Sequence, residues 1–144
     1  HLDIRLSELA KCYRAEYSRY ADDITFSGDS NIKNMIPVVT QIIQEENFCV
    51  NQEKTRYAFY YQRQEVTGLI VNKKVSIPKS YLKEIYKEIY YCKKFGVTSH
   101  LNKTDNHKSF FKDYIYGKAY FIKMVDEELG HKILKELDSI MWEY

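Results

Sequence analysis

The chain has 144 residues, and its 22 Lys and Arg against 20 Asp and Glu give a formal net charge of +2 at pH 7. This length fits one domain, or one domain and part of another. No apolar run approaches the roughly 20 residues of a membrane-spanning helix, and the first residues lack a signal-peptide pattern. A nearly neutral chain has no general attraction for nucleic acid, so such binding would depend on where its charges lie.

The three cysteines, Cys12, Cys49 and Cys92, are far apart in the sequence. Their spacing fits neither a zinc site nor a disulfide framework. We therefore expect reduced thiols and a cytoplasmic protein.

Residues 2–12 have helical spacing of apolar side chains and lead into two short segments with strand composition, residues 17–21 and 24–27. Between the segments stand only Asp22 and Asp23, which predicts a tight hairpin. With Asp22 and Asp23 as a two-residue turn, Ala21 would lie opposite Ile24. The same register predicts three further pairs: Tyr20 with Thr25, Arg19 with Phe26, and Ser18 with Ser27.

Period-two alternation sorts this hairpin into two faces. Ala21, Ile24 and Phe26 would share an apolar face. The other face would carry one phenol and three hydroxyl groups, from Ser18, Tyr20, Thr25 and Ser27.

Two adjacent aspartates at a turn are unfavourable for two reasons. Such turns need positive φ, which Asp adopts less readily than Gly, and the like charges repel each other. Backbone strain concentrates at functional sites, and an oxygen-seeking ion such as Mg²⁺ would relieve the repulsion. The alternative for Asp22 and Asp23 is an acidic turn exposed to solvent.

Further along, the pattern predicts an α+β arrangement. Gly28 to Asn31 suit a turn, and residues 34–47 suit a helix that has Pro37 in its first turn and covers the hairpin. The predicted strands are 48–50, 56–62, 65–71 and 75–77, with a turn at 51–55.

From Pro78 onward the pattern is helical. Pro78 suits the first position of a helix that ends at Gly96. A polar loop at 96–106 and helices at about 108–125 and 127–142 would follow, with Asp126 as the cap of the last helix. The lysines of the first helix could lie along a phosphate backbone or form a solvated face with i,i+4 ion pairs. They are Lys79, Lys83, Lys87, Lys93 and Lys94.

The segment from Tyr20 to Ser27 resembles the palm hairpin of bacterial reverse transcriptases. Residues 51–55, Asn-Gln-Glu-Lys-Thr, resemble the motif in which a lysine, here Lys54, lies near the nucleotide phosphates. Val66-Thr67-Gly68 resembles the region by which retron reverse transcriptases recognise a structured RNA, and residues 117–130 resemble the late thumb of the family. Outside this resemblance, Lys54 could be a solvated turn residue and residues 66–68 a strand ending in a bulge.

The resemblance implies the fold of a partial polymerase. Residues 1–77 would be the C-terminal part of the palm, with the catalytic β-hairpin, its covering helix and a small antiparallel sheet. Residues 78–144 would be a helical thumb bundle.

The resemblance also implies a chemistry. An RNA-directed DNA polymerase extends a DNA primer on an RNA template, using dNTPs and two Mg²⁺ ions. Asp22 would be the main metal ligand, Asp23 a neighbouring acid with a lesser role, and Tyr20 a primer contact. Residues 64–71, with Val66, Thr67 and Gly68, would position primer or a cognate structured RNA, and Lys79, Lys83 and Lys87 would contact nucleic acid.

The family needs a further aspartate from an earlier palm strand, and before Asp22 this chain has only Asp3, which falls in a helical pattern. The segments that form the fingers are missing as well. We therefore expect a fragment that is inactive alone. The alternatives are a module that binds RNA or an RNA–DNA duplex without catalysis, a retron-related phage-defence polymerase and a group II intron maturase.

Overall fold

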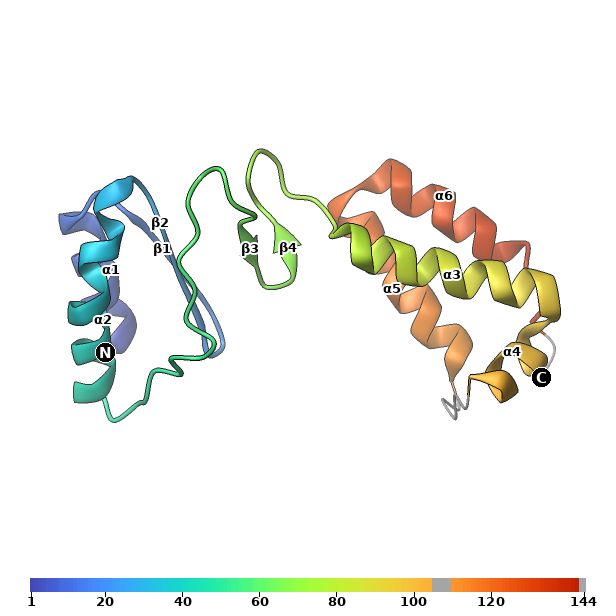
Figure 1. The fold of residues 1–144 in the computed structure, drawn as a ribbon, viewed down its shortest axis with the longest axis horizontal. Coiled ribbons are helices and arrows are strands. Elements are labelled where there is room, and N and C mark those ends of the chain that lie inside the picture. The colour runs from blue at the N-terminus through green and yellow to red at the C-terminus, as the bar shows by residue number, and fades with distance from the viewer. Residues whose placement is uncertain (105–109, 143–144) are drawn as a thin grey trace. The chain divides into compact units, whose positions relative to one another are not determined.

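The structure is a computed structural model that describes residues 1–104 and 110–142. Its fold is α+β, as expected from the sequence, with two small hairpins and six α-helices among the described residues. The chain divides into two compact units, residues 1–67 and residues 68–144, each of which is described by itself (Figure 1). No helix within the described ranges is long and apolar enough to cross a lipid bilayer.

The first unit is built from two helices and a hairpin. Helix α1, Leu2–Cys12, is followed by β1, Glu16–Tyr20, and β2, Asp23–Ser27. A 3₁₀ helix, η1, Ser30–Met35, then leads directly into α2, Ile36–Glu45. Pro37 lies in the first turn of α2, as predicted, where its missing N–H is not needed.

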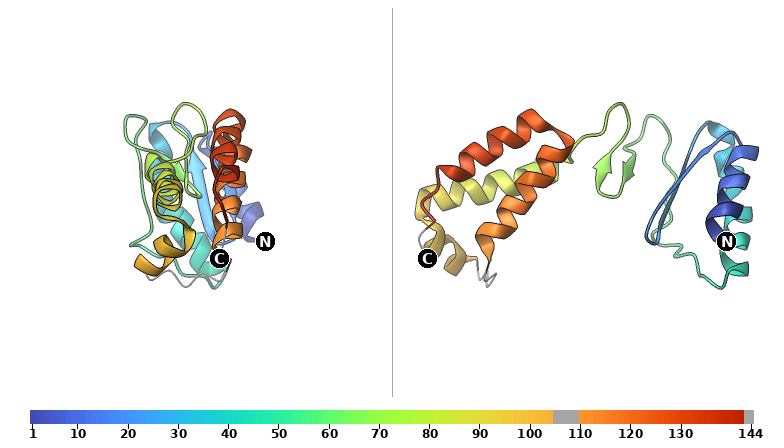
Figure 2. Two further views of the ribbon diagram at one scale, coloured as in Figure 1. Left: turned by 90° about the vertical axis from the view of Figure 1, so that its right-hand side faces the viewer. Right: turned by 180° about the vertical axis from the view of Figure 1, so that it is seen from behind.

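Helix α1 packs on β1, and α2 packs on α1 and on η1 (Figures 1 and 2). The predicted covering role of α2 is therefore shared with α1. Val39 of α2 reaches the same apolar cluster as Tyr17 of β1 and Phe26 of β2. The buried centre of this cluster is small, because it consists of Ala10, Ala15 and Met35.

The predicted strands at 48–50 and 56–62 are wrong, because neither segment is a strand in the structure. β-propensity reflects packing against neighbouring strands more than the segment itself, and these segments have no strand beside them. The turn at 51–55 is present: the Asn51 side chain accepts hydrogen bonds from the N–H groups of Glu53 (3.0 Å) and Lys54 (3.2 Å).

The predicted strand at 65–71 is a short hairpin, in which β3, Glu65–Val66, pairs with β4, Leu69–Ile70. Thr67 and Gly68 form its turn, and both have positive φ, 47° and 82°. The predicted strand at 75–77 is reduced to one bridge between Ile70 and Ser76. The boundary between the two units falls in this turn.

The second unit is helical, with α3, Lys79–Phe95, α4, Val97–Lys103, α5, Phe111–Val125, and α6, Glu127–Asp138. Pro78 caps α3 instead of occupying its first turn, and Gly96, with φ 80°, ends it as predicted. The predicted loop at 96–106 is wrong as far as Lys103, because α4 lies there; residues 105 and 106 are outside the described residues. The same is true of residues 108 and 109 of the predicted helix 108–125.

Helices α5 and α6 pack against each other closely, and α3 adds the third helix of this core. A Cβ on Gly130 would lie only 2.3 Å from the Cα of Lys123, so glycine is needed where these helices meet. Asp126 caps α6 as predicted, since its carboxylate accepts a hydrogen bond from the N–H of Leu129 (3.0 Å). The largest fully buried side chains of this core are Ile85, Phe111, Ile115, Ile122, Ile133 and Leu137.

Candidate functional site

The β1–β2 hairpin is the centre of the candidate site. Its strands are antiparallel, with Tyr17 opposite Phe26, Ser18 opposite Thr25, and Tyr20 opposite Asp23. The two-residue turn therefore consists of Ala21 and Asp22, and Asp23 is the first residue of β2. The predicted register, with Asp22 and Asp23 in the turn, is wrong by two positions.

The physical reason lies in the ring pair below the turn, which compensates for a cost in the turn itself. Ala21 takes the positive φ that the turn requires, 53°, although alanine adopts such a φ less readily than aspartate. The observed register also places Tyr17 beside Phe26, with ring centroids 5.3 Å apart, where the predicted register would have placed Arg19. The strain expected at the aspartates is therefore located at Ala21.

A shift of two positions leaves the faces of a hairpin unchanged, because side chains alternate with period two. Ile24 and Phe26 share one face with Tyr17 and Arg19, as the pairing shows. The opposite face carries the predicted phenol and hydroxyl groups, and the register adds a carboxylate, Asp23, directly across from Tyr20.

The three polar residues at the hairpin tip, Tyr20, Asp22 and Asp23, are exposed. Tyr20 keeps 73% of its surface accessible, and Asp22 and Asp23 are exposed as well. The described residues contain no group of three or more His, Cys, Asp or Glu side chains that could hold a metal ion. Carboxylate oxygens are the ligands that Mg²⁺ prefers, so this chain supplies suitable but incomplete donors for such an ion.

Asp3 has a structural role on the opposite face. One carboxylate oxygen accepts a hydrogen bond from the Tyr17 hydroxyl and the other from the Arg19 guanidinium, both at 2.5 Å. The Tyr17 hydrogen bond is the largest influence that lowers the pKa of Asp3, and Arg19 adds to it. Burial, followed by the hydrogen bond to Asp3, raises the pKa of Tyr17 to about 12. Asp3 therefore ties α1 to β1.

Four further predicted contact residues come later in the sequence than the hairpin tip: Lys54, Val66, Thr67 and Gly68. Lys54 is exposed in the Asn51 turn. Val66 is half-buried at the end of β3, and Thr67 and Gly68 form the exposed β3–β4 turn.

Lys79, Lys83 and Lys87 are exposed and stand four residues apart on α3, so they share one face. The acidic residues of α3 are used elsewhere within the second unit. Glu84 pairs with Lys118 of α5 and Glu88 with His100 of α4, each at 2.6 Å. The three lysines form no ion pair with any acid in the described part of the chain, so the alternative of an i,i+4-paired face is not what the structure shows.

Lys93 and Lys94, also considered from the sequence, have partners. Lys93 pairs with Glu136 of α6. The Lys94 ammonium donates a hydrogen bond to the Tyr90 hydroxyl (3.0 Å), which is the largest influence raising its pKa. Tyr86 and Tyr90 are exposed on the same face as Lys79, Lys83 and Lys87 and extend it.

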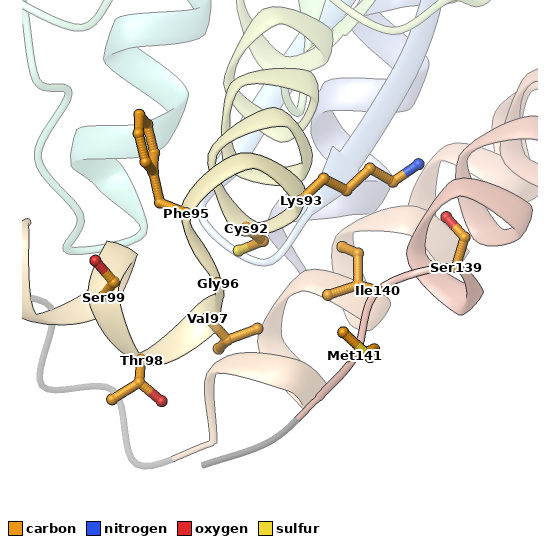
Figure 3. Close-up of a pocket in the computed structure, with 10 residues that line it drawn as sticks. All are labelled: Cys92, Lys93, Phe95, Gly96, Val97, Thr98, Ser99, Ser139, Ile140 and Met141. Carbon is orange, nitrogen blue, oxygen red and sulfur yellow. The ribbon is translucent and has the colours of Figure 1, made fainter.

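A cavity of about 520 Å³ lies at the C-terminal end of α3 (Figure 3). Its lining joins the α3–α4 junction to the segment after α6. Of the residues singled out from the sequence as candidate nucleic-acid contacts, Lys93 is in this lining. The lining residues are Cys92, Lys93, Phe95, Gly96, Val97, Thr98, Ser99, Ser139, Ile140 and Met141.

The strand prediction for residues 56–62 does not account for the aromatic rings between Lys54 and Gln64. The segment has strand composition, but instead of pairing with another strand its rings contact each other. A usable signal was present: the segment contains no Leu, Ile, Val or Met to bury in a core.

Comparison with known proteins identifies a class. Models of protein families give no match, but over most of its length the chain is a distant homologue of reverse transcriptases. The similar proteins are retron reverse transcriptases, as the resemblance predicted. The chain is 30% identical to the retron Mx162 reverse transcriptase of Myxococcus xanthus over 96% of its length. It is 32% identical to the retron Ec86 reverse transcriptase of Escherichia coli over 99% of its length.

A third relative, the retron Mx65 reverse transcriptase of Myxococcus xanthus, is 47% identical over 49% of the chain. The matched regions make up 31%, 42% and 17% of the Mx162, Ec86 and Mx65 proteins. The chain therefore spans less than half the length of each of these relatives.

Proposed function

We propose that this chain is a palm and thumb portion of an RNA-directed DNA polymerase of the retron type. The observation that carries the proposal is the exposed hairpin tip, where Asp22 lies in the turn and Asp23 stands opposite Tyr20, in a chain homologous to retron reverse transcriptases. In this proposal residues 1–77 belong to the palm and residues 78–144 to the thumb.

Asp22 and Asp23 would hold Mg²⁺ together with a further carboxylate that the described residues do not supply. Two such ions would activate the primer 3′-hydroxyl and stabilise the charge on the triphosphate. Tyr20, beside Asp23 on the same face, would contact the primer end, and Lys54 would lie toward the nucleotide phosphates. The substrates would be an RNA template, a DNA primer and dNTPs.

Residues 64–71 would position primer or a cognate structured RNA. Their geometry supports this, because the positive φ of Thr67 and Gly68 forms a tight exposed turn at which no atom lies within 4 Å of the Cβ position of Gly68. Backbone groups at such a turn are accessible to a nucleic acid.

The decisive experiment uses Asp22→Asn in the longer polymerase that we propose contains this chain. Mg²⁺-dependent primer extension on an RNA template should fall by more than about 100-fold, because an electrostatic stabiliser of the reacting phosphates is lost. Duplex binding should be retained. Asp29→Asn is the matched control, since Asp29 is exposed just after the same hairpin, and it should leave extension unchanged. Equal extension by Asp22→Asn and wild type would refute the proposal.

The 144 residues alone should not extend a primer, because a two-metal site needs more carboxylates than this hairpin provides. Extension by the purified chain that requires Asp22 would show instead that the hairpin is sufficient.

A second candidate function, duplex binding without chemistry, is favoured by the acid-free face of α3. The lysines at 79, 83 and 87 lie along one line and have no described acidic partner, a pattern suited to a phosphate backbone. Replacing all three by alanine should weaken RNA–DNA duplex binding and lower the slope of log K against log salt by about 2 to 3. Lys132→Ala is the control, because Lys132 is paired with Glu128. An unchanged slope would remove this function.

The remaining alternatives, a phage-defence polymerase without a cognate RNA and a group II intron maturase, differ in their products. Nucleic acid purified with the longer protein from cells should contain RNA joined covalently to DNA if the retron proposal is correct. DNA without attached RNA would favour the alternatives.

A further inference from the structure

Four aromatic rings form a continuous array in residues 57–61, with Tyr57 half-buried and the other three exposed. Tyr57 meets Phe59 edge to face at 4.8 Å, and Phe59 is stacked on Tyr61 at 5.4 Å with 4° between the ring planes. Tyr60 meets Tyr61 edge to face at 5.3 Å. Tyr60 and Tyr61 are 86% and 68% exposed, so flat aromatic surface is held at the outside of the molecule.

The array is ordered by a turn whose hydrogen bonds involve the side chains of Gln62 and Gln64, which follow it in the sequence. The N–H of Gln62 donates to the carbonyl of Phe59, and the N–H of Phe59 donates to the side-chain oxygen of Gln62, both at 2.9 Å. The Gln64 amide donates to the carbonyl of Ala58 at 3.5 Å. This ordering reduces the entropy that a ligand would otherwise have to remove on binding.

The segment that carries the array is positively charged. From Lys54 to Gln64 the chain has three cations and no carboxylate, with Glu53 and Glu65 flanking the segment. Arg63 is paired with Glu65 at 2.8 Å, whereas Lys54 and Arg56 are exposed and have no ion pair with any acid that the structure describes. Two cations without an ion pair therefore precede the rings in the sequence.

We propose that residues 54–61 are a stacking platform for single-stranded nucleic acid. Unpaired bases would stack on Tyr60 and Tyr61, and Lys54 and Arg56 would contact the phosphates. Such surfaces combine aromatic rings with a positive groove. The inference deepens the proposed function, on which it rests, by assigning to this segment an unpaired stretch of nucleic acid next to the duplex.

The composition favours nucleic acid over a protein partner as the occupant. Aromatic rings and arginine are common in protein–protein interfaces as well, but lysine is depleted there, and this segment has Lys54 and no aliphatic side chain larger than that of Ala58. Phenol rings with neighbouring cations match the faces of bases and their phosphates instead.

The test measures binding of a fluorescein-labelled single-stranded oligonucleotide of about 12 nucleotides by anisotropy, using the 144-residue chain. The double variant Tyr60→Leu/Tyr61→Leu keeps apolar area but removes the rings. Its Kd should rise about 10-fold or more, given typical base-stacking energies. Tyr60→Phe/Tyr61→Phe should bind like wild type, and so should Tyr120→Leu, which removes an exposed ring of α5. Circular dichroism checks that each variant is folded.

An abasic oligonucleotide of the same length separates stacking from charge. Wild type should bind it about as weakly as the leucine variant binds the normal strand. Equal affinity of wild type and the leucine variant for the normal strand would overturn the inference. The inference would also be overturned if the leucine substitutions weakened binding to the abasic strand as much as binding to the normal strand. Primer extension is measured separately in the longer protein. If extension depends on Asp22 but single-strand binding does not depend on the rings, only this inference is refuted. If binding depends on the rings but extension does not depend on Asp22, only the proposed polymerase function is refuted.

Discussion

At the scale of single residues, Asp3 shows a carboxylate that is committed to a structural role. Its two oxygens are both used, by Tyr17 and by Arg19. It was the one aspartate before Asp22 that could have completed the acidic cluster. Its role is instead to fix the apolar face of the hairpin to α1, so that the opposite face stays exposed.

Asp3→Asn should lower stability at neutral pH. The folded-state pKa of Asp3 lies below its ordinary value of 3.8, so its contribution is complete above that value and is lost as the pH falls through the folded-state pKa. Thermal unfolding of wild type and Asp3→Asn from pH 7 to pH 3 should give melting temperatures that differ at pH 7 and converge at the acidic end. Glu8→Gln, on the exposed side of the same helix, should change neither. A difference that does not shrink as the pH falls below 3.8 would contradict the assignment.

The residue scale also shows what the sequence could predict about the site. The two faces of the paired strands follow from alternation and were predicted correctly, except that Ala21, expected on the apolar face, lies in the turn. The turn could not be fixed in the same way, because registers two residues apart bury the same side chains. The observed register is favoured by the Tyr17–Phe26 ring contact, which is not visible in a hydrophobic pattern.

At the scale of helices and strands, the two glycines of the last helix pair have opposite requirements. A Cβ at Gly130 of α6 would collide with the backbone of Lys123, whereas a Cβ at Gly117 of α5 would meet nothing within 4 Å. One glycine is needed for packing and the other is only tolerated.

Gly130→Ala should destabilise the protein by about 1–3 kcal/mol or more, because α5 and α6 must move apart. Gly117→Ala should instead stabilise it by up to about 1 kcal/mol, through the better helix propensity of alanine. Urea unfolding followed by circular dichroism measures both. If the two substitutions had the same effect, the close contact at Gly130 would not exist in solution.

Elements with a repeating apolar stripe, α1, α2, α3, α5 and α6, were all predicted at nearly their observed positions. Helix α4 was missed, because Val97 to Lys103 is short and mostly polar, and its burial depends on Val97 and His100 packing inside the second unit. The strand at 56–62 failed for the opposite reason: a favourable composition had no neighbouring strand to pair with.

At the scale of the whole molecule, the residues that the structure describes form two apolar cores. One lies in the first unit around Ala10 and Met35, and the other in the second unit around Ile115 and Ile133. We therefore expect the hairpin and the helical bundle to be stabilised independently.

Ile115→Ala should therefore cost about 2–5 kcal/mol in the second unit alone. Hydrogen–deuterium exchange should become faster in α3, α5 and α6 and stay unchanged in β1 and β2. Met35→Ala should give the reverse pattern. Faster exchange in both units after either substitution would mean that they unfold as one.

The two-residue turn at the hairpin tip restricts the number of residues between Tyr20 and Asp23 more than it restricts which side chains stand there. Inserting or deleting one residue between Tyr20 and Asp23 would rotate every following position of β2 to the other side of the ribbon, sending Asp23 toward α1 and Ile24 into water. Natural variants should therefore show substitutions at these positions but a constant spacing between the tyrosine and the second aspartate.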